Sequence, residues 1–169
     1  MLPREFRIES VDESTDPVLR NLFEHYLHDM AQWFEFDTQS DGRYECSTRE
    51  MWDKPFTVYF AYAGAIPIGF GLVGSAEAWT GDATVLDMDE FFVIRRYRRH
   101  GVGAALANHI WDQHPGPWLV RVLRANLPAV PFWRGIVAAR SGNDFQEQTL
   151  TSNQRLWSYF TFANPPHLP

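Results

Sequence analysis

The residues best suited to chemistry lie in one stretch of the chain, from Asp87 to Leu106. It begins with an apolar, β-favouring segment, residues 91–94, continues through a basic turn, residues 95–100, and enters a helical pattern at Gly101. The first amides of a helix lack partners within the helix, and the helix dipole favours an anion there. Because glycine lets a ligand approach the backbone closely, the stretch predicts a site for a diphosphate group.

Two common nucleotide motifs do not fit this turn. A P-loop requires Lys-Ser or Lys-Thr after its last glycine, whereas Ala104 and Ala105 follow Gly103. The dinucleotide fingerprint requires a third glycine at the position of Leu106. The remaining pattern is Arg98-x-x-Gly101-x-Gly103-Ala104, in which the arginine and its neighbour Arg99 supply charged donors for phosphate oxygens. A plain strand–helix turn with a solvated arginine face is the other interpretation of the same residues.

Length and composition narrow the class of protein. A chain of 169 residues with 45% hydrophobic and 15% aromatic residues predicts one folded domain, residues 1–169. The net charge of -6 argues against a general nucleic-acid binder. Cys46 is the single cysteine, so the sequence predicts no intrachain disulfide and no cysteine-based metal site. Without a leader-like N-terminus or an apolar run of about 20 residues, we expect a cytoplasmic protein that does not enter a membrane.

Hydrophobic periodicity places the remaining elements. Asp16 is expected to cap a helix that begins with Pro17. Gly69 and Gly71 lie within a strand and predict a bend or a close approach of another backbone. Strands are predicted at residues 5–11, 56–63, 66–73, 83–94, 118–123, 145–150 and 155–162, and helices at residues 16–33, 101–114 and 126–136, with a loop at 76–82.

A polar segment, residues 37–50, follows the first predicted helix, and a short helix is expected after Ser47. It is flanked by aromatic residues, so it is interpreted either as a lid over an acceptor pocket or as a connecting loop. The polar face of the preceding helix carries Glu24, His25, His28 and Asp29. We interpret this face as solvated, with Glu24 or Asp29 as the residues that could reach a substrate.

Two motifs in order carry a family resemblance. Arg98-x-x-Gly101-x-Gly103-Ala104 resembles the acyl-CoA-binding motif of the GNAT superfamily of N-acetyltransferases, and Asn126-x-x-Ala129-x-x-Phe132-Trp133 resembles the family's later helix. The resemblance implies an α/β (α+β) fold in a single GNAT-like domain. Its centre would be a mixed, mostly antiparallel twisted sheet of about seven strands flanked by about four helices, with a parallel strand pair splayed at the acyl-CoA site.

The resemblance also implies roles for individual residues. The backbone of residues 92–94 would pair with the pantetheine arm, and the amides of residues 99–104 would hold the diphosphate. Arg98 or Arg99 would reach a phosphate, Asn126 would hold the pantetheine or a water molecule, and Phe132 would border the arm. The complete set of expected acetyl-CoA-binding residues is Phe92, Val93, Ile94, Arg98, Arg99, His100, Gly101, Val102, Gly103, Ala104, Asn126 and Phe132. Acetyl-CoA is the implied cosubstrate, and no metal ligand set is visible.

The implied reaction is direct attack of a primary amine on the acetyl thioester. An alkylamine with a pKa of about 10.4 is mostly protonated at neutral pH, so a base is required. Glu90 is the favoured base and Asp89 the second candidate, while Asp87 lies on the same predicted strand. Trp133 stands where the family usually carries a tyrosine acid, and an indole cannot replace that acid.

Two other functions stay open at this level. One is a non-catalytic acyl-CoA-binding module, which Trp133 favours, and the other is a protein or nucleic-acid interaction domain that uses residues 95–100. The acceptor is expected to be a small-molecule amine rather than a nucleic acid, but aminoglycosides, polyamines, amino acids and protein N-termini all fit. The sequence leaves both a monomer and a homodimer open.

Overall fold

The computed structural model describes residues 6–53 and 56–165. The strands are β1 (Arg7–Val11), β2 (Thr57–Ala63), β3 (Ile66–Ser75), β4 (Leu86–Val93), β5 (Gly116–Leu123), β6 (Phe145–Ser152) and β7 (Arg155–Asn164). The α-helices are α1 (Asp16–Met30), α2 (Glu77–Thr80), α3 (Val102–Gln113) and α4 (Ala129–Ser141), with short 3-10 turns at Glu13–Thr15, Arg49–Trp52 and Arg95–Tyr97. The strands form a seven-stranded mixed sheet in the order β1-β2-β3-β4-β5-β7-β6, which confirms the predicted fold.

The expected parallel strand pair is present. β4 pairs with β5 in parallel, through Leu86 with Trp118 and Asp87 with Leu119, and these two residue pairs are the whole ladder in the part of the chain that the structure describes. The pairs β1–β2, β5–β7 and β6–β7 are antiparallel. A parallel pair requires a crossover connection, and α3 supplies it between β4 and β5.

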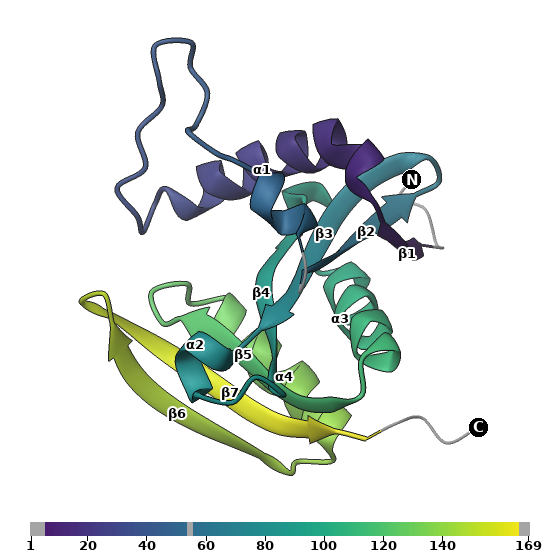
Figure 1. Cartoon of the computed structure of the whole chain (residues 1–169), viewed down its shortest axis with the longest axis vertical. Coiled ribbons are helices and arrows are strands. Elements are labelled where there is room, and N and C mark those ends of the chain that lie inside the picture. Colours follow the sequence, from purple (N-terminus) through teal and green to yellow (C-terminus); the bar gives the residue numbers. More distant parts are fainter. Residues whose placement is uncertain (1–5, 54–55, 166–169) are drawn as a thin grey trace. The chain divides into compact units, whose positions relative to one another are not determined.

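The chain divides into two compact units, and β3, β4 and α3 each run from one unit into the other. The first unit comprises the chain up to Leu72 together with residues 90–106. Its core forms where α1 packs on the sheet, as the ribbon shows (Figure 1). Leu19, Leu22, Phe23 and Leu27 recur at helical spacing, are buried, and pack against Val58, Phe60, Phe70, Leu72 and Phe92. Each such side chain contributes about 1.5–3 kcal/mol of burial free energy.

The start of α1 differs from the prediction. Asp16 is the first helical residue instead of the cap, because a 3-10 turn capped by Asp12 precedes it. The Asp16 carboxylate accepts hydrogen bonds from Thr48 and from Trp52 Nε1, the latter at 2.8 Å, and pairs with Arg20. The hydrogen bond from Thr48 is the main reason that the pKa of Asp16 is lowered.

The segment after α1 is tied to that helix. The Tyr44 amide donates to Glu24 at 3.2 Å, the Tyr44 hydroxyl lies 3.3 Å from His28 Nδ1, and Thr38 forms a β-bridge with Tyr44. Together with the hydrogen bonds from Thr48 and Trp52 to Asp16, these contacts bind the segment to the start of α1 as well as to its later turns. Two of the residues placed on a solvated helix face, Glu24 and His28, are therefore partners of this segment.

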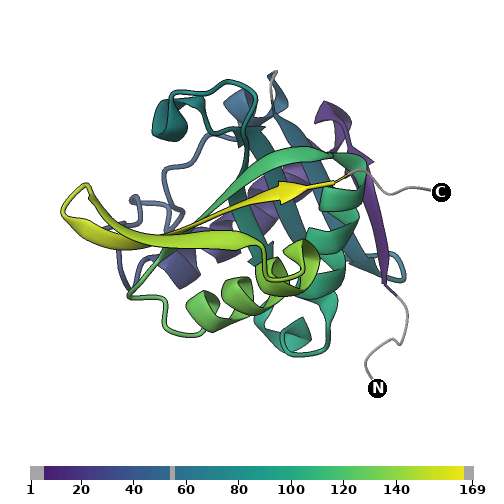
Figure 2. The ribbon, with the colours of Figure 1, turned by 90° about the horizontal axis from the view of Figure 1, so that it is seen from below.

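The second unit comprises residues 73–89 and the chain from Ala107 onward. β6 and β7 form a long hairpin whose turn extends beyond α4 (Figure 2). One side of its sheet is covered by an aromatic cluster in which the Trp111 ring lies 6.4 Å from Trp118, 6.4 Å from Trp133 and 5.2 Å from Phe162. Trp111 is fully buried, so this cluster forms part of the core of the unit, and a second buried cluster comprises Ala76, Leu119 and Tyr159.

Several predicted boundaries need correction. The loop at 76–82 contains α2, a single turn that is too short for a periodic signal and ends at Gly81, which has a left-handed φ of 74°. α1 ends at Met30 instead of Trp33, while α4 continues to Ser141, where Gly142 with φ 63° ends it. The predicted strand start at Glu5 lies outside the described residues.

Asn164 closes the end of α3. Its side-chain amide donates to the carbonyls of Trp111 at 2.6 Å and His114 at 2.9 Å, and its oxygen accepts from Arg140 Nε at 2.7 Å. Arg140 also pairs with Asp112 at 2.6 Å. The last carbonyls of a helix need partners outside it, and this buried side chain supplies them.

Replacing Asn164 by leucine, which has a similar size, is expected to lower the free energy of unfolding by about 2–4 kcal/mol, because three hydrogen bonds are lost in a buried place. Urea denaturation followed by tryptophan fluorescence measures the loss. Asn21→Leu, at an exposed position of α1, is the matched control and should change stability by less than about 0.5 kcal/mol. Equal stability of both variants would contradict this role for Asn164.

None of the helices in the described residues is long and apolar enough to span a membrane.

Candidate functional site

The turn between β4 and α3 has the backbone shape of an anion site. Arg98 is extended, Arg99 is left-handed with φ 61°, and Gly101 is left-handed with φ 82°. The Ala105 amide donates to the Gly101 carbonyl at 2.9 Å at the start of α3, and the buried Val102 anchors this end of the helix. Alternation of left-handed residues before a helix N-terminus gathers amides into a concave nest that binds anions. A left-handed arginine is unusual, so the surrounding contacts must hold this turn.

The side chain of Arg98 connects the turn to neighbouring elements. Its Nε donates to the Val93 carbonyl at 2.7 Å, its Nη2 pairs with Asp29, and its guanidinium lies 5.3 Å from the centre of the Phe92 ring. The Arg98 side chain thus braces the turn against the end of β4 and against α1. Its exposed neighbour Arg99 extends from the turn itself.

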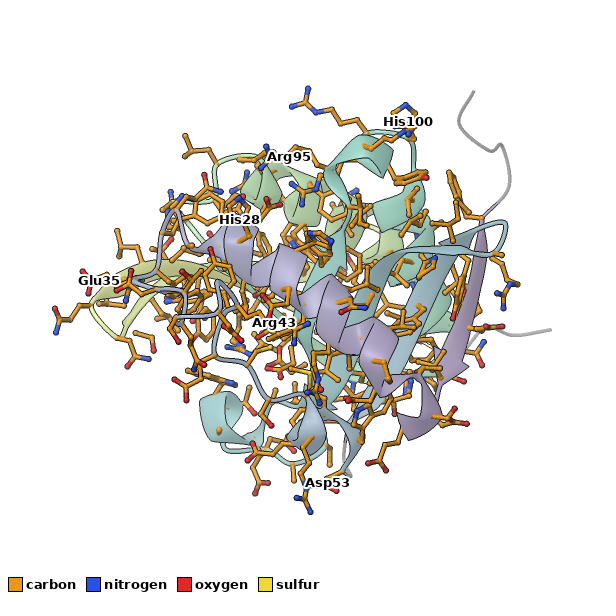
Figure 3. The ribbon with its side chains drawn as sticks, turned by 90° about the horizontal axis from the view of Figure 1, so that it is seen from above. His28, Glu35, Arg43, Asp53, Arg95 and His100 are labelled. Atoms are coloured by element: carbon orange, nitrogen blue, oxygen red, sulfur yellow. The ribbon has the colours of Figure 1, made fainter. Side chains whose placement is uncertain are left out.

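Asp29 is the anchor for this arginine pair. Besides Arg98, it accepts from Arg95 Nη2 at 2.9 Å. In Figure 3 the labelled Arg95 lies beside the C-terminal turns of α1, near His28. Burial raises the pKa of Asp29, but the hydrogen bond and charge of Arg98 and the charge of Arg95 outweigh burial, so the pKa is lowered. The His100 ring, on the same turn, is fixed by a 2.6 Å contact between Nδ1 and the Arg98 carbonyl.

Replacing Arg98 by alanine is expected to lower the free energy of unfolding by about 1.5–3 kcal/mol, because its charged hydrogen bonds to Asp29 and the Val93 carbonyl are both lost. Arg96→Ala removes the same charge from an exposed position and should cost less than about 0.5 kcal/mol. Thermal unfolding at several salt concentrations measures both variants. A cost for Arg98→Ala as small as that for Arg96→Ala would show that the brace does not stabilise the turn.

The end of β4 is fixed to β3 by a close backbone approach. A Cβ added to Gly69 would lie 2.5 Å from the Phe92 carbonyl oxygen, so no other residue fits there without a shift. The Ile94 amide donates to the Ile68 carbonyl at 2.8 Å, and the Phe92 ring packs between Tyr26 and Phe70. The close approach predicted from the glycines of β3 is confirmed at Gly69. Of the three residues expected to face pantetheine, Ile94 uses its amide, and Val93 its carbonyl, within the protein.

The first half of β4 carries a buried charged cluster within the second unit. Arg121 of β5 donates from Nε to Asp87 Oδ2 at 2.9 Å and from Nη2 to the same oxygen at 2.5 Å. Arg121 Nη2 also donates to Asp89 Oδ1 at 2.7 Å. The Trp79 ring of α2 covers the guanidinium, with 4.3 Å from Cζ to the ring centre. Glu90 follows in the chain and is partly buried.

Asp87 is the most perturbed carboxylate of this cluster. The side chain of Asp87 is 1% exposed, and its Oδ1 atom has no hydrogen-bond partner in the described residues. Burial raises its pKa from 3.8 to about 6, although the charge and hydrogen bonds of Arg121 oppose the shift. A buried carboxyl group whose pKa lies near neutral pH is a functional candidate.

The expected residues of the later helix have distinct positions. The Asn126 carbonyl accepts from Ala129 at 3.0 Å and so starts α4, and Phe132 is partly buried. Trp133 is 7% exposed and belongs to the aromatic core beside Trp111. Its indole ring is therefore packed within the core of the second unit. Within the described residues, no group of three or more His, Cys, Asp and Glu side chains could hold a metal ion.

The pairing of two residues of the site was not anticipated, although Asp29 had been named as a residue that could reach a substrate. Asp29 was placed on a solvated helix face, and its partners come from a turn more than sixty residues later in the chain. Arg121 lies in an apolar run, Trp118–Leu123. A lone arginine in such a run is itself a signal, since a buried charge requires a partner of opposite charge. The nearest carboxylates on a neighbouring predicted strand were Asp87 and Asp89.

A parallel strand pair joined by a helix, with two left-handed residues in the turn at that helix's N-terminus, is an α/β arrangement suited to a phosphate-bearing ligand. The chain belongs to the GNAT acetyltransferase family, because the model of the acetyltransferase (GNAT) family matches residues 22–136. This match includes both sequence motifs and the charged cluster.

Solved structures have the same fold. The yncA protein of Salmonella typhimurium, solved with its cofactor acetyl-CoA, is 12% identical, with 97% of this chain and 96% of that chain covered and a TM-score of 0.67. The ribosomal-protein-alanine N-acetyltransferase of Brucella melitensis is 15% identical, with 93% and 99% covered and a TM-score of 0.66. Nourseothricin acetyltransferase is 16% identical, with 95% and 99% covered and a TM-score of 0.57. No curated protein matches the chain.

Proposed function

We propose that this protein transfers an acetyl group from acetyl-CoA to a primary amine. The observation that carries the proposal is the nest formed by the left-handed residues Arg99 and Gly101 at the N-terminus of α3. Such a nest suits the diphosphate of CoA, because backbone amides and the helix dipole both favour a compact anion. The amides of residues 99–104 would hold the diphosphate, and the exposed side chain of Arg99 is available for a further phosphate.

The carboxylates of β4 would prepare the amine. A protonated amine has no lone pair for attack, so a base must accept a proton before the nitrogen attacks the thioester carbonyl. We assign this role to Glu90, with Asp89 as the alternative. The new C–N bond then forms as the C–S bond breaks, the CoA thiolate leaves, and the proton that the nitrogen must still lose to become an amide passes to solvent or to the thiolate. Thiolate is a good leaving group, so the reaction proceeds without an acid at Trp133, which is buried in the core.

The names of the structural neighbours support no single acceptor. One acts on an alanine of a ribosomal protein and another on nourseothricin, and both share this fold at low identity. Acceptor choice therefore depends on side chains of this chain rather than on its architecture. A non-catalytic acyl-CoA-binding protein is the second candidate, and the absence of an acid at Trp133 is the observation that favours it.

Thiol release from acetyl-CoA tests the proposal. Purified protein is incubated with acetyl-CoA and, in turn, n-butylamine, spermidine, kanamycin, lysine and an alanine-initiated peptide. Amine-dependent release of thiol, with the acetylated product confirmed by mass spectrometry, is the expected result. Glu90→Gln should lower the rate by about 100-fold or more while acetyl-CoA binding stays the same. Binding of acetyl-CoA without transfer to any amine would favour the non-catalytic alternative.

A further inference from the structure

Asp29, in the last turn of α1, pairs with two arginines of the turn that precedes α3. Its carboxylate accepts a hydrogen bond from Arg95 Nη2 at 2.9 Å and another from Arg98 Nη2. The side chain of Asp29 is 16% exposed, whereas that of Arg95 is 77% exposed and that of Arg98 40%. The carboxylate is therefore the anchored member of this group, and its pairing with Arg98 is better shielded from solvent than its pairing with Arg95.

The helix α1 holds Asp29 in place beside the end of β4. Leu27, two residues earlier in the helix, is buried in the core of the first unit. The ring of Tyr26 lies 6.1 Å from the ring of Phe92, edge to face, and so packs the last turns of α1 on β4. Asp29, the end of β4 and the turn all belong to the first unit, so one packed core positions the carboxylate against the turn.

The hydrogen bond from Arg98 to Asp29 bears on the shape of the turn. Arg98 Nε donates to the Val93 carbonyl at 2.7 Å, so the guanidinium is held on one side by β4 and on the other by α1. Arg99, directly after it, has a left-handed φ of 61°, which costs an L-residue about 1–2 kcal/mol. Such a backbone persists only where its surroundings hold it. We expect the amides of the turn to lose their common orientation when Arg98 loses its partner on α1.

We propose that Asp29 is a positioning residue for acetyl-CoA, which acts through Arg98 to keep the turn in the shape that binds the diphosphate. The inference rests on the proposed function and adds α1 to the elements on which cosubstrate binding depends. Electrostatics alone predicts the opposite effect, because a carboxylate close to a bound polyanion repels it and its removal should strengthen binding. The sign of the change in affinity therefore separates positioning from charge.

Isothermal titration of Asp29 variants with acetyl-CoA tests the inference. Asp29→Asn keeps the size of the side chain and removes its charge, and it should raise the dissociation constant by about three- to ten-fold, which is part of the cost of a left-handed residue. Asp29→Glu retains a carboxylate and should recover part of the lost affinity. Glu35→Gln removes the same charge from an exposed position a few residues after α1, and it should change the affinity by less than about two-fold.

A double-variant cycle tests whether Asp29 acts through Arg98. Once Arg98→Ala has removed the guanidinium, adding Asp29→Asn should weaken acetyl-CoA binding no further. A general loss of helix packing would instead weaken binding by the same factor in both backgrounds. Thermal unfolding of each variant establishes that it is folded at the temperature of the titration.

Unchanged or tighter binding of acetyl-CoA by Asp29→Asn would overturn the inference, and so would an equal loss of affinity in the Arg98→Ala background. A native protein that does not bind acetyl-CoA would overturn it together with the proposed function. Binding of acetyl-CoA without thiol release in the presence of any amine would contradict the proposed function alone, because the titrations do not depend on turnover.

Discussion

Replacing Gly101 and Gly103 together by glutamate is expected to raise the dissociation constant for acetyl-CoA by about 100-fold or more. Gly101 has a φ of 82°, and an L-residue there costs about 1–2 kcal/mol. Each added carboxylate also repels the diphosphate by about 1 kcal/mol or more. Isothermal titration with acetyl-CoA measures the combined effect.

Two single variants separate shape from charge. Gly101→Ala changes only the backbone preference, since an added Cβ at this position meets no atom within 4 Å. It should weaken binding by about ten-fold, in line with the cost of the left-handed conformation. Gly135→Glu adds the same charge at an exposed helical glycine with open space around it, so acetyl-CoA binding should be unchanged. Native affinity in the double variant would mean that this turn does not hold the diphosphate.

Arg121→Met is expected to lower the free energy of unfolding at neutral pH by about 3–5 kcal/mol, because it leaves the buried Asp87 without its counter-ion. Methionine fills a similar volume, so the loss measures charge more than packing. The double variant Asp87→Asn, Arg121→Met removes both buried charges and should recover most of the lost stability. Urea denaturation of the three proteins gives the comparison, and a double variant no more stable than Arg121→Met would contradict it.

The pH dependence of stability follows from the direction of the pKa shift. The folded-state pKa of Asp87 is raised from 3.8 to about 6, so the folded protein binds this proton more tightly than the unfolded chain. The stabilising contribution is complete below the unfolded pKa and is lost as the pH rises through about 6. For Asp87 alone, the free energy of unfolding falls by about 3 kcal/mol as the pH rises from 3.8 to about 6. The Asp87→Asn variant should lack this pH-dependent loss of stability. Urea denaturation of both proteins at several pH values therefore isolates the contribution of Asp87.

Much of the fold follows from local patterns in the sequence. The apolar spacing of Leu19, Leu22 and Phe23 predicts the buried face of α1, and the glycines of the turn after β4 predict an anion site. Helix α2 was missed because its four residues are too few to show a hydrophobic periodicity. The end of α4 was placed too early because the continuing helix is only partly apolar, and Gly142 determines where it stops.

The side chains of the site were harder to predict, since their partners come from distant parts of the chain. Arg98 belongs to the motif, and the sequence alone suggested that its side chain binds a phosphate group. The hydrogen bonds of Arg98 to Asp29 and to the Val93 carbonyl depend on the packing of α1 beside this turn. No local sequence pattern predicts that packing. The pairing of Arg121 with Asp87 likewise depends on the register of β4 and β5. The periodicity of apolar residues predicts which face of a helix or strand is buried. The register between strands decides which charged side chains come into contact.

The close contact at Gly69 has a consequence for comparing this chain with its homologues. Residue 69 is far from the turn in sequence, yet its missing side chain lets the Phe92 carbonyl pass at a place where a methyl group would collide. Alignments of homologues with this strand geometry should therefore contain glycine at this column as regularly as at the column of Gly101. A homologue with a larger residue there must carry β4 along a different path. Glycine at this column can thus sort homologues by strand geometry before any of their structures is solved.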